Sequence, residues 1–354
     1  MHEITERVED VFVIHDFFEK KERLIYIGYF ITPDIREGIS YLRERLKEIG
    51  YIPSVHRLKG MYYALEILPE QKLALRDFMV PLLLFFLTVL TTMFAGAMHY
   101  LGSFEKFIDE FPKSLIHGFP FSFALLSILL SHEMGHFFTS RKYRVEATLP
   151  FFIPVPHPLI GTFGAFIKMK SVIPDKRALL RIGAAGPLAG IVVSLPFTVW
   201  GIMHSNVIPS QEGKGFFLGD PLLFKILVSL LKPDITPDAT LVIHPIAFAG
   251  WIGFFVTAMN LLPFSQLDGG HIAYALFGEK YNFIQLILFP FLILMGFLWP
   301  GWFFWGFLLL LFGLRHPPPI DNITPLENRD KIIGVICIIV FFFTFHPVPF
   351  SVKL

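Results

Sequence analysis

The chain is poor in charge and almost free of cysteine. Only 17% of its 354 residues are Asp, Glu, Lys or Arg, whereas soluble domains carry about a quarter. The net charge is +1, which gives no reason to expect a nucleic-acid partner. The one cysteine, Cys337, excludes an intrachain disulfide and lies in an apolar stretch, so we expect it to be reduced and structural.

The N-terminus also lacks a recognisable export signal. Its first ten residues, MHEITERVED, are polar and acidic and have no apolar core of a cleaved signal peptide. What the chain has in abundance is apolar surface, because 54% of its residues are hydrophobic and 42 are Phe. This composition predicts a membrane protein.

Charged residues are concentrated in residues 1–76, which we expect to form a small cytosolic α+β domain. The run TPDIREGISYLRERLKEIG predicts a helix that Thr32 caps and that ends near Gly50. This part contains no evident catalytic cluster, so we expect a regulatory or substrate-selecting module whose role the sequence does not define. The predicted strands are 11–18, 23–30, 51–58 and 61–68, around an apolar helix face of Ile35, Ile39, Leu42, Leu46 and Ile49.

Residues 77–354 contain long runs with little charge, as transmembrane helices require. Pro300 and Gly301 interrupt one very long run and predict two short spans there. We therefore expect a polytopic α-helical membrane protein with six or seven transmembrane helices. The seven candidates lie within 77–105, 113–138, 181–212, 238–268, 280–315 (two spans) and 331–353.

The basic residues predict the orientation of these helices. Lys and Arg gather in the loop between the second and third candidate spans, at 141–144 and 168–181. Loops rich in Lys and Arg face the cytoplasm. We therefore expect this loop and the N-terminal domain to be cytoplasmic, in a multi-pass protein of the cell membrane. The loops at 100–117 and 205–240 carry no positive excess, which suits the opposite side.

The second candidate span ends in SHEMGHFF, which contains H-E-x-x-H. On a helix His132 and His136 share one face and can bind one metal ion. Glu133 can then hold a water beside that ion, as in zinc hydrolases. Ionisable groups inside a membrane are costly and mark functional sites. The alternative is that the three side chains only form hydrogen bonds between helices.

A metal bound by two histidines needs a third protein ligand. The sequence MNLLPFSQLDGGHI, after the fourth candidate span, offers Asp268 and, as a competitor, His271. Pro263 ends a helix, and we expect Gly269 and Gly270 to permit an unwound chain. We choose Asp268, at the start of a short following helix. The alternative role for Asp268 is a simple helix cap.

Together, H-E-x-x-H and the later N-x-x-P-x-x-x-L-D-G-G resemble the site-2 protease family of intramembrane zinc metalloproteases. The stretches GTFGAFIKMKS (161–171) and GAAGPLAG (183–190) also resemble this family, in its branch without a PDZ domain. The resemblance covers residues from about 78 to 275 and leaves out the N-terminal 76. It implies zinc ligands at His132, His136 and Asp268, a catalytic Glu133, and an Asn260 near the substrate or oxyanion.

This resemblance implies a zinc metalloendopeptidase with one Zn²⁺ per chain. The expected substrate is a single-pass membrane protein, cut in or near its transmembrane helix, close to the cytoplasmic face of the lipid bilayer. A metal-ion transporter that uses the same His and Asp residues is a second hypothesis, and a catalytically inactive membrane scaffold is a third. A transporter would show ligands along several spans, and a scaffold would lack a motif residue.

Two glycine-containing stretches have less specific interpretations. The alternating Phe163, Ile167 and Met169 predict an extended segment that adds a strand to the substrate, or else a structural hairpin packed between helices. The glycines of GAAGPLAG, Gly183, Gly186 and Gly190, predict close helix packing without a catalytic role. For the lone histidines His157, His204 and His244 we expect interfacial positions rather than metal binding.

Overall fold

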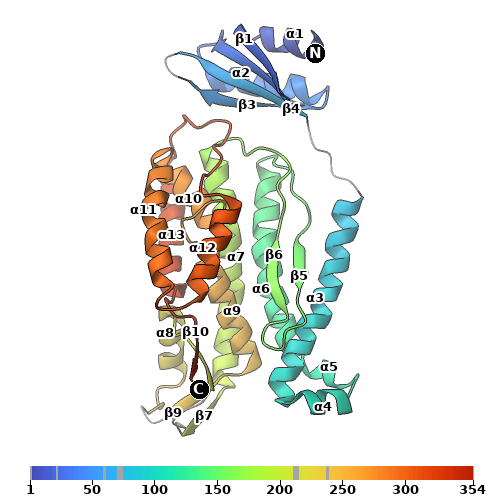
Figure 1. Ribbon diagram of the computed structural model, residues 1–354, viewed down its shortest axis with the longest axis vertical. Coiled ribbons are helices and arrows are strands. Elements are labelled where there is room, and N and C mark those ends of the chain that lie inside the picture. Colours follow the sequence, from blue (N-terminus) through green and yellow to red (C-terminus); the bar gives the residue numbers. More distant parts are fainter. Residues whose placement is uncertain are drawn as a thin grey trace.

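The computed structural model describes residues 2–20, 23–58, 61–69, 75–209, 215–236 and 239–353. Its N-terminal part is an antiparallel sheet in the strand order β1-β2-β4-β3, covered by helices α1 and α2 (Figure 1). The predicted ββαββ order is therefore confirmed. The bounds are α1 His2–Glu9, β1 Phe12–Lys20, β2 Arg23–Phe30, α2 Ile35–Lys47, β3 Tyr51–Arg57 and β4 Tyr63–Pro69.

Both helices bury an apolar face against one face of this sheet. On α2, Leu42 and Leu46 are fully buried, as the sequence predicted. Helix α2 begins at Ile35, however, so the predicted cap at Thr32 is wrong: its hydroxyl donates to the Asp34 carbonyl within a bend instead. Helix α1 was not expected from its polar composition, and it contributes Ile4 and Val8 to the core.

Below the sheet lie the long apolar helices of a membrane protein. Three are long and apolar enough to cross a membrane: α3 Arg76–Leu101, α6 Phe119–Lys142 and α7 Lys176–Met203. The described residues also include four shorter apolar helices: α8 Leu222–Leu231, α9 Pro245–Asn260, α11 Lys280–Met295 and α12 Gly301–Phe312. The remaining helices are α4 Phe104–Asp109, α5 Ser114–His117, α10 Asp268–Phe277 and α13 Asn328–Thr344.

Several predicted spans are longer than the helices that the structure shows. The run at 238–268 contains a helix of only 16 residues, α9, because His244 and Pro245 begin it and a turn follows Asn260. The run at 331–353 ends its helix at Thr344, and Pro347 and Pro349 prevent it from continuing. At these places the chain forms two short strands, β9 Ala239–Val242 and β10 Phe350–Lys353, which pair with β7 Asn206–Pro209 and β8 Gly215–Leu218 from the segment between α7 and α8.

The segments that connect the helices lie at the two opposite ends of the helices. Helices α4 and α5 and strands β7 and β9 lie at the end away from the N-terminal sheet (Figure 1). The two ends of the loop between α6 and α7, where its basic residues gather, lie on the same side as that sheet (Figure 1). At this side Lys170 Nζ bonds Asp77 Oδ2 at 2.5 Å and links the start of α3 to the loop.

A hairpin runs between the membrane helices. Strands β5 Phe151–Pro154 and β6 Thr162–Phe166 pair antiparallel and lie along α3 and α6 (Figure 1). Phe163 of the predicted extended segment lies in β6, Ile167 and Met169 follow its end, and the hairpin packs between helices as the alternative interpretation expected. Gly161 has φ +83°, and a Cβ there would lie 2.4 Å from the Thr91 carbonyl oxygen of α3. Only glycine fits this turn without moving the hairpin away from α3.

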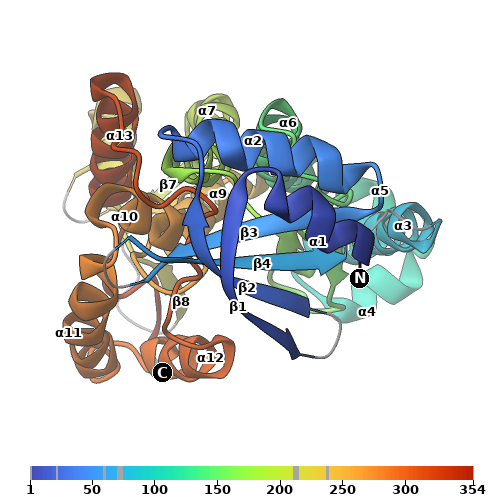
Figure 2. The ribbon, with the colours of Figure 1, turned by 90° about the horizontal axis from the view of Figure 1, so that it is seen from above.

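The loop between α12 and α13 reaches up to the N-terminal sheet. Its Ile320 is 5% exposed and belongs to the core beneath α1 and α2. The same loop bonds the chain before α7, with the Ile320 and Asp321 amides donating to the carbonyls of Ile173 and Pro174. Seen from above, the sheet lies over the helix ends (Figure 2).

Candidate metal centre

Helix α6 brings both histidines of H-E-x-x-H to one face. His132 and His136 are 3% and 5% exposed, and they face α7. The glycines of α7 make this approach possible. A Cβ at Gly186 would lie 2.0 Å from His136 Nε2, and one at Gly190 would lie 3.2 Å from His132 Nδ1. Gly186 therefore leaves the space in which the His136 ring lies, in addition to the packing that the sequence predicted.

The third predicted ligand stands at the start of α10. Helix α9 ends at Asn260, the chain turns, and α10 begins at Asp268, as expected. Gly269 and Gly270 are not unwound but belong to the first turn of α10. A Cβ at either position would lie 2.0–2.3 Å from a carbonyl oxygen, of Leu261 or Ser265. The two glycines thus allow α10 to start in contact with the preceding turn.

A buried glutamine in α11 holds this turn in place. Gln285 is 1% exposed, and its Oε1 accepts hydrogen bonds from the Ser265 amide and the Tyr281 hydroxyl, both at 2.6 Å. Ser265 has φ +49°, an uncommon conformation for a residue other than glycine. Gln285 was not among the residues predicted from the sequence. The signal was present, because Gln285 is a polar residue inside an apolar run.

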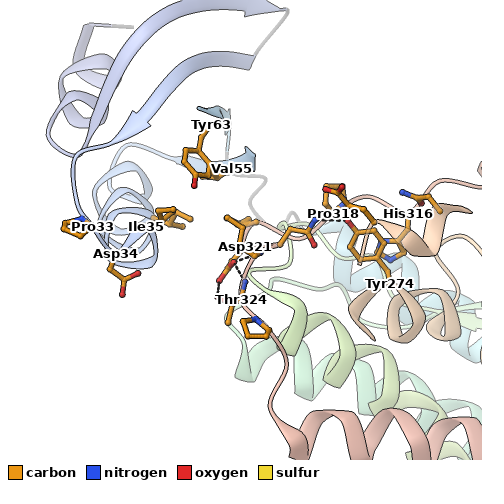
Figure 3. A pocket seen from close by; sticks show the side chains of 17 residues that line it. Pro33, Asp34, Ile35, Val55, Tyr63, Tyr274, His316, Pro318, Asp321 and Thr324 are labelled. Atoms are coloured by element: carbon orange, nitrogen blue, oxygen red, sulfur yellow. Dashed lines mark hydrogen bonds between the residues drawn. The ribbon is translucent and has the colours of Figure 1, made fainter. Parts of the chain in front are cut away.

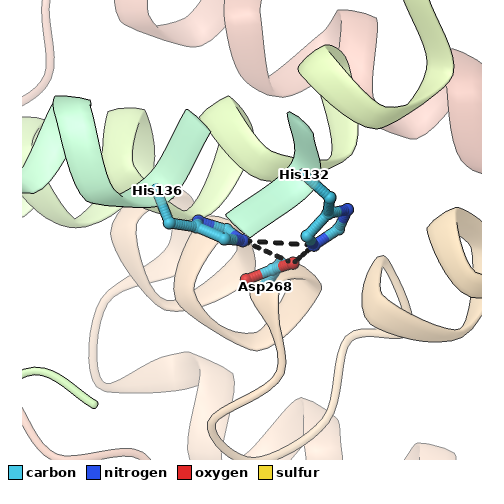
Figure 4. A group of neighbouring side chains, drawn as sticks. All are labelled: His132, His136 and Asp268. Atoms are coloured by element: carbon cyan, nitrogen blue, oxygen red, sulfur yellow. Dashed lines mark hydrogen bonds and ion pairs between the residues drawn. The ribbon is translucent and has the colours of Figure 1, made fainter. Parts of the chain in front are cut away.

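The three predicted ligand atoms meet in one compact triangle (Figure 4). Asp268 Oδ2 lies 3.2 Å from His132 Nε2 and 3.2 Å from His136 Nε2. The two Nε2 atoms are also 3.2 Å apart. These ligand atoms come from α6 and α10. His132 and Asp268 are 136 residues apart in the sequence. Among the described residues, the triangle of His132, His136 and Asp268 is the one cluster of three or more side chains that could bind a metal ion.

The triangle has the dimensions that a zinc ion requires. Bonds of about 2.0–2.1 Å in a tetrahedron place neighbouring ligand atoms about 3.3 Å apart. The observed edges of 3.2 Å match one face of that tetrahedron, and its fourth corner is the position that water takes in catalytic zinc sites. Two imidazoles and one carboxylate are also the ligand types found in catalytic zinc sites.

Hydrogen bonds around the triangle orient the ligands. His136 Nδ1 donates to the Ile182 carbonyl at 2.7 Å, which fixes the tautomer and leaves Nε2 for a metal. Asn260 Nδ2 lies 3.1 Å from His132 Nε2, at the last residue of α9. The predicted substrate or oxyanion residue is therefore beside the metal-binding atoms.

Glu133 lies beside the triangle and is not one of its three donors. Its side chain is 6% exposed, and its carboxylate lies within hydrogen-bonding reach of the backbone of Ile167, just after β6. A buried carboxylate beside a metal-binding cluster is a candidate general base. The hairpin of β5 and β6 thus forms part of the wall around Glu133.

His271, the competing third ligand, points elsewhere. Its Nδ1 lies 2.6 Å from Nε2 of His316, and it is outside the cluster that Asp268 completes. His316 comes from the loop between α12 and α13 and is 4% exposed. His316 was not among the residues predicted from the sequence. The lone histidines His157, His204 and His244 are likewise outside the cluster.

Comparison with known proteins agrees with this geometry. The profile of peptidase family M50 matches residues 120–295, which contain α6, α7, the turn after α9 and α10. Residues 120–295 therefore form a peptidase family M50 domain. This is the site-2 protease family that the motifs resemble, and its members are membrane proteins.

Curated relatives in plants support the assignment to family M50. The rice protein named probable zinc metalloprotease EGY1, chloroplastic, is 38% identical over 45% of this chain and 28% of its own length. The Arabidopsis protein of the same name is 32% identical over 62% of this chain and 41% of its own length. The indica rice protein named probable zinc metalloprotease EGY2, chloroplastic, is 30% identical over 68% of this chain and 44% of its own length. The chain thus spans less than half of each of these relatives, and no solved structure matches it.

Proposed function

We propose that this chain is a zinc-dependent endopeptidase that cuts membrane-protein substrates in or near a transmembrane helix. The observation that carries the proposal is the 3.2 Å triangle of His132, His136 and Asp268, with buried Glu133 beside it, on a helix long enough to cross a membrane. The family M50 domain and the names of the plant relatives support the same activity.

The side chains around the metal position divide the chemistry between them. His132, His136 and Asp268 would hold the zinc ion, which supplies Lewis-acid activation of water and of the scissile carbonyl. Glu133 accepts a proton from the attacking water and delivers it to the leaving amine as the C–N bond breaks. Asn260 Nδ2 donates a hydrogen bond to the carbonyl oxygen as negative charge develops on it.

The hairpin next to Glu133 offers a way to hold the substrate. Strand β6 pairs with β5 in a two-stranded sheet, and its Phe163 is 80% exposed. An extended substrate segment adds to the other edge of β6 by main-chain hydrogen bonds, which presents its peptide bonds to the site. The substrate helix must unwind over this segment before it is cut.

The membrane arrangement extends the same proposal. Six or seven helices cross the bilayer, with the shorter apolar helices completing the three long ones. The N-terminal domain and the basic loop between α6 and α7 face the cytoplasm, because Lys and Arg favour that side. Cleavage then takes place near the cytoplasmic face of the cell membrane, on a single-pass membrane protein.

Zinc content and cleavage test the proposal together. We expect about one zinc per chain in the wild type and in Glu133→Gln, since three protein ligands remain in both. Asp268→Ala should lose the zinc. In cleavage of a membrane-embedded reporter, Glu133→Gln should be inactive, with a loss of at least about 10²-fold, because it removes the general base. A chelator should abolish cleavage, and added zinc should restore it.

Two results would contradict the proposal. Cleavage by Glu133→Gln at the wild-type rate would show that Glu133 is not the general base. If the wild-type protein binds no zinc even after zinc is added back, the triangle is only a polar contact between α6 and α10.

A further inference from the structure

A large cavity separates the N-terminal sheet from the membrane helices. Its volume is about 1040 Å³, at the upper end of the ~300–1,000 Å³ that ligand pockets occupy. Its walls come from four places: the start of α2, the sheet, helices α10 and α11, and the loop between α12 and α13 (Figure 3). The cavity does not include the proposed zinc ligands.

Two residues of the cavity lining, Asn282 and Asn322, each have a buried side-chain oxygen without a hydrogen-bond partner. Asn322 donates through Nδ2 to the Tyr274 hydroxyl at 3.1 Å, which fixes its amide and leaves the oxygen as an acceptor. Buried polar groups in proteins are nearly always paired, so unpaired acceptors at a cavity indicate a ligand that donates hydrogen bonds.

Charge in the wall favours a cationic ligand. Carboxylates of Asp34, Glu279 and Asp321 line the cavity, and Asp321 accepts hydrogen bonds from Thr324. Among the described residues of the lining there is no lysine or arginine. Burial lowers the pKa of His316 to about 3, so its imidazole adds no positive charge at neutral pH.

The cavity is one pair of side chains away from the metal centre. His316 lines the cavity, and its other ring nitrogen contacts His271 at 2.6 Å. His271 stands one helical turn after Asp268 on α10. The cavity and the triangle therefore share helix α10, which carries Tyr274 in the cavity wall and Asp268 in the triangle.

We propose that this cavity binds the juxtamembrane segment of the substrate, as an extended chain rich in Lys or Arg. The proposal rests on the proposed function, because it assumes that a membrane protein is cut. Segments that flank transmembrane helices on the cytoplasmic side carry an excess of Lys and Arg. Their cationic groups and backbone amides supply the donors that Asn282 and Asn322 lack.

The N-terminal domain then has a role that the sequence alone did not define. It closes the cavity from above with Pro33, Ile35, Val55 and Tyr63, while the membrane helices close it from below. Substrate selection depends on both parts, and a substrate with an acidic juxtamembrane segment is rejected.

Peptide binding to the full-length protein in an uncharged detergent tests this inference. The probe is a fluorescein-labelled peptide of alternating Lys and Ala, and its counterpart carries Glu in place of Lys. We expect saturable binding of the Lys peptide to the wild type and to Glu133→Gln. Asn322→Leu and Glu279→Lys should weaken it roughly five- to tenfold, since each removes an acceptor or reverses a charge.

Matched controls carry the same changes outside the cavity. Asn328→Leu and Glu105→Lys are exposed and should bind like the wild type. Equal affinity in cavity and control variants, equal affinity for the Glu peptide, or no saturable binding would overturn the inference. A photo-crosslinking version of the Lys peptide gives a second measurement on the wild type. Attachment within 33–39 or 316–325 supports the inference, and attachment only elsewhere overturns it.

The inference and the proposed function fail in different ways. The proposed function fails if the wild type binds no zinc. The inference fails if the wild type binds zinc and cleaves a reporter, while Asn322→Leu and Glu279→Lys bind the Lys peptide as the wild type does.

Discussion

Single residues decide whether the metal centre can form. Gly186 in α7 shows this most directly, because an added Cβ would lie 2.0 Å from Nε2 of His136. Distances below 3.0 Å to a ring atom force something to move. The atom in conflict is one of the proposed ligand atoms, so the displacement acts on the site itself.

We therefore predict that Gly186→Ala loses most of its zinc, with a fall of about 10-fold or more in occupancy at limiting zinc. Loss of optimal ligand geometry of this kind typically costs 10- to 100-fold in metal affinity. Zinc per chain in the purified protein measures the effect.

Gly334→Ala in α13 is the matched control. Its added Cβ would lie 3.0 Å from the flexible end of Leu276, away from the three ligands. It should keep the zinc content of the wild type. Full zinc occupancy in Gly186→Ala would show that α7 can move away from His136 at no cost to the site.

Among the structural elements, the hairpin of β5 and β6 connects α3 to Glu133. Gly161→Ala would place a methyl group 2.4 Å from the Thr91 carbonyl oxygen, and it would also strain the left-handed turn. We predict at least a roughly tenfold loss of cleavage with zinc retained, because small displacements near an active site are costly.

Gly164→Ala tests backbone strain alone, without displacement of the hairpin from α3. Gly164 has φ +101°, and its added Cβ would meet nothing within 4 Å. This variant carries the backbone strain without the clash, so it should lose less activity than Gly161→Ala. If the two variants lose cleavage equally, the contact between the hairpin and α3 does not govern activity.

An ion-pair cluster around the buried Asp330 joins α7 to α13. Asp330 is 0% exposed and pairs with Arg181 at 2.7 Å and with Arg177 at 3.3 Å, while both arginines stay partly exposed. Arg177 also pairs with Glu327. We predict that Asp330→Ala lowers the free energy of unfolding by about 2 kcal/mol, because it removes a charge-assisted hydrogen bond to Arg181. Unfolding in detergent measures this, with Glu105→Ala, exposed on α4, as the control expected to stay within about 0.5 kcal/mol.

For the whole molecule, the loop between α12 and α13 is the connection between its two parts. Ile320 inserts into the N-terminal core, while Ile323 in the same loop is 46% exposed. We predict that Ile320→Ala destabilises the N-terminal domain by about 2 kcal/mol or more, as large-to-small changes in cores do. Ile323→Ala should change it by less than about 0.5 kcal/mol.

Hydrogen exchange in the sheet and in α2 measures this difference. Faster exchange in Ile320→Ala than in Ile323→Ala is the expected result. Equal exchange in the two variants would mean that the N-terminal domain is stable without the loop.

Much of the fold followed from local patterns. The period of apolar residues predicted α2 and the four strands of the N-terminal sheet, and the uncharged runs predicted the positions of the long helices. The errors came where the tertiary structure overrides local pattern. Helix α1 is polar overall but buries Ile4 and Val8, and the run that contains α9 looked longer than the helix because apolar residues also fill its flanks.

The sequence by itself determined the chemistry of the site, because H-E-x-x-H sets two imidazoles and a carboxylate at helical spacing and L-D-G-G supplies another carboxylate. Only the tertiary structure decided that His271 turns to His316 while Asp268 meets the two histidines at 3.2 Å. It also decided that Gly186 leaves room for His136, that Gln285 holds the turn before Asp268, and that a cavity lies beneath the N-terminal sheet. These depend on contacts between residues far apart in the chain, which no local spacing encodes.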